Sequence, residues 1–202
     1  MTTRSPDDSA PRADAGPSGS TRERILEAAR VMVAGGDMTP SLNDLARHAG
    51  VGVGTVYRHF ATHDVLIEAL ADERLSEVVA GARVALTEPD PVVGLEQFVR
   101  ATLRLVMADR CLGAVLRTEG SDRTGGRLAE LEETVAVLLS RGRRAGALRP
   151  EVTARDLQRL LCGLDSAVRA GPDPDDAAAR YVTILLAGLR VPAAPVVTTG
   201  KR

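Results

Sequence analysis

The sequence predicts an all-α protein with a helix-turn-helix near its N-terminus. Apolar residues recur at helical spacing through most of the 202 residues, and no segment shows the strict alternation of a β-strand. Residues 41–60 form two short amphipathic segments around a glycine turn. We therefore expect a three-helix head followed by a larger C-terminal helical domain. A chain of this length can bury a sizeable core.

Composition agrees with an ordinary globular protein. Hydrophobic residues make up 44% and charged residues 26% of the chain, and the net charge is −1. A near-neutral charge argues against a general nucleic-acid coating protein. The sequence has no apolar run of membrane-spanning length and no apolar N-terminal signal region, so we expect a cytoplasmic protein. Cys111 and Cys162 match no metal-ligand spacing and are expected to be buried thiols rather than a disulfide.

Four parts follow from the composition. Residues 1–20 are rich in Pro, Ser, Ala, Gly and Asp without apolar periodicity, which predicts a disordered arm. Residues 21–66 form the predicted helix-turn-helix domain, and residues 67–190 form the second helical domain. Residues 191–202 contain two prolines and are expected to be a flexible tail.

The head is predicted to contain helices at residues 21–34, 41–49 and 53–60. Thr21 can cap the first helix, and Gly35 ends it. Ser41 begins the second helix, and Asp44 stands three residues later, where a capping box places its acidic residue. Gly50 ends this helix after two turns.

Six more segments of the second domain have helical period. Thr62 is a suitable cap for the first of them, Pro91 suits the first turn of the next, and Thr153 can cap the fifth. The expected ranges are 63–82, 91–107, a short segment at 111–118, 127–145, 153–170 and 173–189. Glycines within 120–126 and at Gly171 separate the later helices.

The turn of the helix-turn-helix lies at residues 49–51. Gly50 can adopt the left-handed backbone that such a short turn requires. Val51, Val56 and Phe60 are spaced to pack inward. The residues left partly exposed are Gly52, Val53, Thr55, Tyr57, Arg58 and His59.

These exposed residues are better explained by contact with DNA than by exposure to water. Val53, Tyr57 and Arg58 together make an unusual solvated surface, whereas Tyr and Thr hydroxyls bind phosphates and Arg reaches guanine edges. The alternative is a helical hairpin inside an α-helical core, with no role in DNA binding.

The residues from 45 to 60, LARHAGVGVGTVYRHF, are followed by a polar pair and the apolar run VLIEAL. This pattern resembles the N-terminal domain of the TetR/AcrR family of transcriptional regulators over residues 21–70. The rest of the chain resembles the family only as an all-α pattern of five or six helices.

The resemblance implies a ligand-responsive regulator, expected to be a repressor, that binds a palindromic operator on double-stranded DNA as a homodimer. The fourth helix would connect the head to a domain that binds a small-molecule effector and dimerises. An effector would shift that helix and release the operator.

By the same resemblance, candidate DNA contacts gather on the second and third helices. They are Ser41, Asn43, Val53, Gly54, Thr55, Tyr57, Arg58 and His59. His63 is a further candidate, at a position where many relatives have Lys; the alternative is a surface residue at a helix start. A neutral His attracts phosphate less than Lys does, and residues 21–66 hold five arginines against five acidic residues. We therefore expect modest salt-dependent non-specific affinity.

Helices near 153–170 and 174–189 are the expected dimer interface, as a four-helix contact. Their apolar stripes are Leu157, Leu160, Leu161, Leu164 and Val168 on one helix, and Tyr181, Ile184, Leu185 and Leu189 on the other. The alternative is that these stripes fill the core of a single subunit.

Polar residues on otherwise apolar helices mark the expected effector pocket, because a buried polar group needs a partner. The predicted lining is Phe98, Thr102, Met107, Cys111, Leu116, Arg117, Cys162 and Asp165, with Arg104, Glu119 and Arg169 as further candidates. Of the four aromatic residues, only Phe98 and Tyr181 lie outside the head. The pocket is therefore expected to be aliphatic rather than built to stack flat aromatic compounds.

Two other function classes compete with a regulator. An enzyme is disfavoured because the sequence holds no nucleophile elbow, phosphate loop or Cys–His constellation. His59 and His63 have the spacing of a zinc pair, but the predicted break at residues 61–62 separates them. No cofactor, metal or membrane partner is expected. The remaining alternative is a helical interaction protein that has lost DNA binding.

Overall fold

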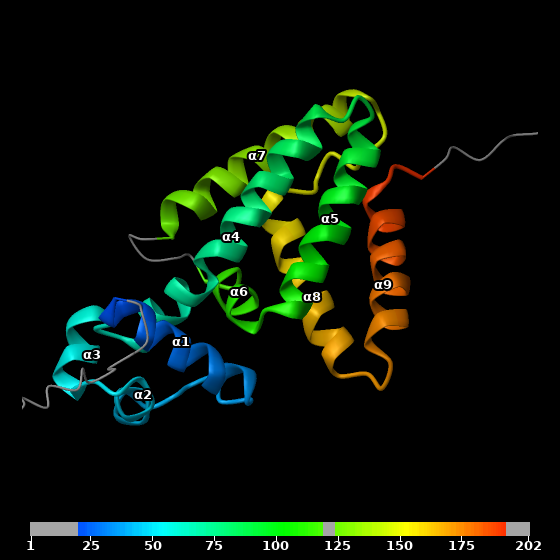
Figure 1. Ribbon diagram of the computed structural model, residues 1–202. Helices are drawn as coiled ribbons and strands as arrows, with labels where there is room; N and C mark the ends of the chain where they lie inside the picture. The colour runs from blue at the N-terminus through cyan, green and yellow to red at the C-terminus, as the bar shows by residue number, and fades with distance from the viewer. Residues whose placement is uncertain (1–19, 119–123, 193–202) are drawn as a thin grey trace, which may run out of the picture. The chain divides into compact units, whose positions relative to one another are not determined.

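The computed structural model describes residues 20–118 and 124–192. Within these ranges the chain forms nine α-helices and no strand, so the predicted all-α fold is confirmed (Figure 1). Contacts divide the chain into two compact units, Met1–His59 and Phe60–Arg202. The predicted arm and tail lie outside the described residues except for residues 20, 191 and 192, and Glu119 lies outside them too.

The first unit contains three helices, α1 (Thr21–Ala34), α2 (Leu42–Ala49) and α3 (Val53–His59). The cap of α1 is Ser20 and not Thr21, so that prediction was wrong by one residue. The Ser20 hydroxyl accepts from the Glu23 amide at 3.3 Å, and the Glu23 carboxylate accepts from the Ser20 amide at 2.7 Å. In a capping box the acidic residue stands three positions after the cap. Glu23 stands three positions after Ser20, so Ser20 and not Thr21 caps the helix.

The second unit contains six described helices. They are α4 (His63–Thr87), α5 (Pro91–Ala108), α6 (Arg110–Val115), α7 (Gly125–Arg144), α8 (Ala154–Arg169) and α9 (Pro174–Leu189). Helix α5 contacts α4, α6, α7, α8 and α9, so it lies at the centre of this unit (Figure 1). No described helix is both long enough and apolar enough to cross a membrane.

Three helices of the second unit begin where the sequence predicted. Thr62 caps α4 by accepting from the Val65 amide at 3.3 Å. Pro91 occupies the first turn of α5. Thr153 caps α8 in a full capping box with Asp156. The Thr153 hydroxyl donates to the Asp156 carboxylate and lowers the pKa of that carboxyl below its usual value.

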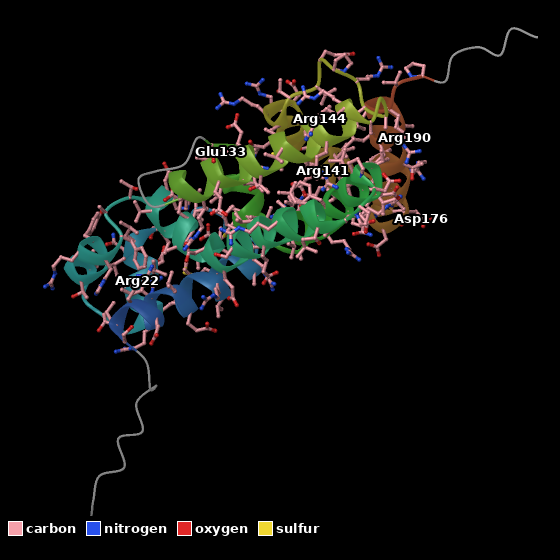
Figure 2. The ribbon with its side chains drawn as sticks, turned by 90° about the horizontal axis from the view of Figure 1, so that it is seen from above. Arg22, Glu133, Arg141, Arg144, Asp176 and Arg190 are labelled. Carbon is pink, nitrogen blue, oxygen red and sulfur yellow. The ribbon has the colours of Figure 1, made fainter. Side chains whose placement is uncertain are left out.

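Arginines of α7 hold α4 at several points along its length. Arg141 donates to the carbonyl oxygens of Leu86, of Glu88 at 2.8 Å and of Pro89 at 3.3 Å, and so covers the C-terminus of α4 (Figure 2). Two ion pairs, Arg127–Asp72 and Arg83–Glu130, join the same two helices. A displacement of α7 would therefore act directly on α4.

Candidate DNA-binding face and effector site

The turn between α2 and α3 has the predicted left-handed glycine. Gly50 has φ +63° and ψ +40°, and its N–H bonds back to carbonyl oxygens of the last turn of α2. Arg24 of α1 donates from Nη2 to the carbonyl oxygens of Ala49 at 2.7 Å and Gly50 at 3.1 Å. Sequence reasoning did not assign Arg24 to this role, since nothing local links residues 25 positions apart.

The start of α2 presents Ser41 and Asn43 to solvent. The Ser41 hydroxyl accepts from the Asp44 amide at 3.1 Å and donates to the Asp44 carboxylate at 2.6 Å. The Asp44 carboxylate thus accepts from the Ser41 hydroxyl and not from the Ser41 backbone N–H. The expected capping box is therefore incomplete. Ser41 caps the helix as predicted.

Helix α3 buries one side chain, Val56, and turns the others outward. Tyr57 is 53% exposed, which is unusual for so large an aromatic residue. Arg58 lies back along its own helix, where Nε donates to the Gly54 carbonyl and Nη2 donates to the Thr55 hydroxyl, both at 3.2 Å. The other exposed candidates are Val53, Gly54 and His59, and Thr55 is half-buried.

His63 belongs to the second unit, as the first residue of α4. Its Nδ1 lies 3.9 Å from the Asp64 carboxylate. Residues 60–62 separate it from His59, the last residue of α3. The described part of the chain contains no cluster of three or more His, Cys, Asp or Glu side chains able to hold a metal ion.

Two family models match the chain. The family described as bacterial regulatory proteins, tetR family, matches residues 25–70, which include the whole helix-turn-helix. The family described as transcriptional regulator SbtR-like, C-terminal domain, matches residues 90–191, about half of the chain. The chain belongs to the TetR family of bacterial transcriptional regulators. Its helix-turn-helix is therefore a DNA-binding head.

Individual relatives agree with this TetR assignment. HTH-type transcriptional regulator SAR0097 of Staphylococcus aureus is 40% identical over 40 residues, which is 20% of this chain and only 21% of that curated relative. The crystal structure of TetR regulator SCO0520 from Streptomyces coelicolor has 28% identity and a TM-score of 0.52, over 85% of this chain and 99% of that one. Mycobacterium smegmatis AmtR has 25% identity and a TM-score of 0.58, over 85% and 88%.

Among the residues that the structure describes, the predicted effector residues line several cavities of this TetR chain. Phe98, Thr102 and Leu116 line a small apolar chamber among α5, α7 and α8. Leu116 also lines an outer groove, together with Arg117 and Cys162. Met107 and Arg104 face a separate groove between α5 and α9.

Cys111 and Asp165 are buried side chains. Burial and the nearby Asp109 raise the pKa of the Cys111 thiol to about 11. Asp165 is 3% exposed and accepts from Arg169 Nε at 2.7 Å, while Arg117 Nη1 lies 3.8 Å from its other oxygen. Arg169 also donates to the carbonyl oxygens at the end of α5. Asp165 therefore ties α8 to α5 through Arg169, which gives it a structural partner.

The apolar stripes of α8 and α9 divide into two sets. Leu157, Leu161, Val168 and Leu189 are buried within this subunit, so for these four the core-filling alternative holds. Leu160 and Ile184 are exposed. Leu164, Tyr181 and Leu185 are half-buried. Periodicity identified both helices as apolar but could not separate their inner faces from their outer faces.

Proposed function

We propose that this TetR-family protein is a ligand-responsive repressor of the cytoplasm that binds a palindromic operator as a homodimer. The observation that carries this proposal is the outward face of α3, where Val53, Tyr57 and Arg58 are exposed around a single buried anchor. Hydroxyl and guanidinium groups on such a helix match the phosphates and base edges of a major groove. In this proposal residues 21–66 form the DNA-binding domain and residues 67–190 form the regulatory domain.

The proposed contacts have different roles. Thr55, Tyr57 and His59 bind phosphates or the groove wall, with Ser41 and Asn43 as backbone contacts from α2. Val53, Gly54 and Arg58 lie against base edges. To reach a base, Arg58 must break its hydrogen bonds to Gly54 and Thr55. Water can replace these bonds because Gly54 is exposed and Thr55 is half-buried. His63 supplies a weaker phosphate contact when neutral.

Substitution of Tyr57 tests the DNA-binding face. Tyr57→Ala should leave folding intact because the ring is exposed, and loss of about 1 kcal/mol per hydroxyl contact in two subunits corresponds to a roughly 30-fold weaker operator complex. Tyr57→Phe, which removes only the hydroxyl, should reproduce most of this loss. Val31→Ala, at an exposed position of α1, is the matched control. Unchanged operator affinity in Tyr57→Ala at moderate salt would contradict the proposal.

Dimerisation is proposed through the exposed sides of α8 and α9. Leu160 and Ile184 lie on these sides, and Gly163 and Gly188 leave open space around their Cα atoms for close helix approach. Helices α8 and α9 of two subunits would form a four-helix interface. Such a dimer would present two DNA-binding heads to the two halves of a palindromic operator.

Release by an effector is proposed to pass through α7. Its first half lines the outer groove with Gly125, Leu128, Ala129 and Glu132. The same stretch carries Arg127 and Glu130, which pair with α4. Since α4 directly follows the helix-turn-helix in the chain, an occupant that displaces α7 also biases α4.

A further inference from the structure

Two cavities of the second unit share part of their walls. The inner chamber is small, about 30 Å³, and its lining is almost wholly apolar apart from Thr102, Glu132 and Gln158. The outer groove is larger, about 540 Å³, and is more open to solvent. Leu116, Glu132 and Gln158 line both. A molecule that lies in the groove can therefore place a methyl-sized tip at the apolar chamber.

The outer groove is rich in arginine. Among the residues that the structure describes, its lining contains three arginines, Arg117, Arg155 and Arg159, and one acidic residue, Glu132. Glu132 lies 3.5 Å from Arg155, so these two charges offset each other. Arg159 faces Asp156 of its own helix at 3.9 Å, and both side chains are largely exposed. Long, exposed pairs of this kind contribute little stability and are readily rearranged.

Arg117 is the cation best placed to turn toward a ligand. Its 3.8 Å contact with Asp165 is long, whereas Arg169 already holds that carboxylate at 2.7 Å. Redirecting Arg117 therefore leaves the buried Asp165 with a charged partner. Leu116, the residue before Arg117, is buried and lines both cavities, which places the cation close to the mouth of the chamber.

We infer that the effector of this protein is an amphipathic anion, with a carboxylate held by Arg117 and Arg159 in the outer groove, its aliphatic chain against Leu116, Leu128 and Ala129 of that groove, and its terminal methyl group at the inner chamber. This inference rests on the proposed function, since it names the chemical class of the effector. A guanidinium pairs with a carboxylate through charge-assisted hydrogen bonds, and the aliphatic lining accepts a hydrocarbon. A planar aromatic cation fits neither part.

Cys162 provides a direct measure of occupancy because it is half-buried and lines the groove. Burial raises the pKa of its thiol, so labelling by iodoacetamide is slow enough to follow. Labelling of Cys162 is located by peptide mass spectrometry, which separates it from the buried Cys111. Octanoate, octanamide and octylamine serve as matched anionic, neutral and cationic probes. We expect octanoate alone to slow the labelling of Cys162 at low concentration.

The variants Arg117→Gln and Arg159→Gln should each weaken protection by octanoate about tenfold, as expected for loss of a charge-assisted hydrogen bond. Arg144→Gln is the control, because Arg144 is exposed on α7 and bonds within its own helix (Figure 2). Circular dichroism confirms folding of each variant. Equal protection by octanamide, unchanged protection in both groove variants, or no protection by any probe would overturn the inference.

Operator release by octanoate is measured separately, by fluorescence anisotropy of labelled operator DNA. Protection of Cys162 without release of DNA would support the anion site and contradict the proposed ligand response. Release by octanamide and octanoate alike would support the ligand response and overturn the anionic class. The failures of the two proposals are thus distinguishable.

Discussion

Gly50 determines the geometry of the turn at the residue scale. Its φ of +63° lies in the region that L-residues enter at a cost of about 1–2 kcal/mol, and an added Cβ would lie 3.1 Å from Arg24 Nη2. We expect Gly50→Ala to lower the free energy of unfolding by about 1–2 kcal/mol in urea denaturation. Gly52→Ala is the control, because its Cβ would meet only the Thr55 hydroxyl at 3.8 Å. An equal loss of unfolding free energy in Gly50→Ala and Gly52→Ala would show that the left-handed backbone of Gly50 is not the cause.

Single residues also show the limit of sequence prediction. The role of Gly50 could be predicted because a short turn between two helices needs a left-handed residue. The hydrogen bonds from Arg24 to that turn could not be predicted, because they join residues 25 and 26 positions apart that only the tertiary packing of α1 against α2 brings together. Asp165 stays a predicted pocket residue, and the structure adds a partner that the prediction did not name: Arg169, four residues along, donates to its carboxylate.

At the scale of elements, Arg141 secures the end of α4. Its guanidinium covers three carbonyl oxygens there, and losing hydrogen bonds from a charged donor typically costs about 1–3 kcal/mol. Arg141→Ala should lower the melting temperature accordingly, as measured by circular dichroism. Arg144→Ala, three residues along α7 and exposed, should leave it nearly unchanged (Figure 2). Matching melting temperatures for the two variants would exclude Arg141 as a clamp on α4.

Three helix starts were predictable because each depends on a capping residue or a proline next to it in the sequence. Thr62, Pro91 and Thr153 all begin helices as expected. The arrangement of the helices was not predictable in the same way. Contacts such as Arg127 with Asp72 join residues 55 positions apart, and nothing in helical periodicity specifies them.

At the scale of the whole molecule, the proposed dimer depends on exposed apolar residues of α8 and α9. Ile184→Glu should convert the dimer to a monomer in analytical ultracentrifugation, because the interface would bury an unpaired charge. The side chain is 63% exposed in one subunit, so folding should survive. Val84→Glu, on α4 and 65% exposed, is a matched control that should remain dimeric. Persistence of the dimer in Ile184→Glu would place the interface elsewhere.

Val56 is the one buried side chain within helix α3, and the exposed residues Val53, Tyr57 and Arg58, which are proposed to face base edges or phosphates, carry none of the core. Stability and operator preference are therefore separable properties of this chain. If these positions read DNA as proposed, single substitutions at Val53, Tyr57 or Arg58 should alter the preferred operator without a compensating change in packing. Under the proposed function, a duplicated copy of this gene could acquire a new target promoter through one codon while the described core of the second unit stays unchanged.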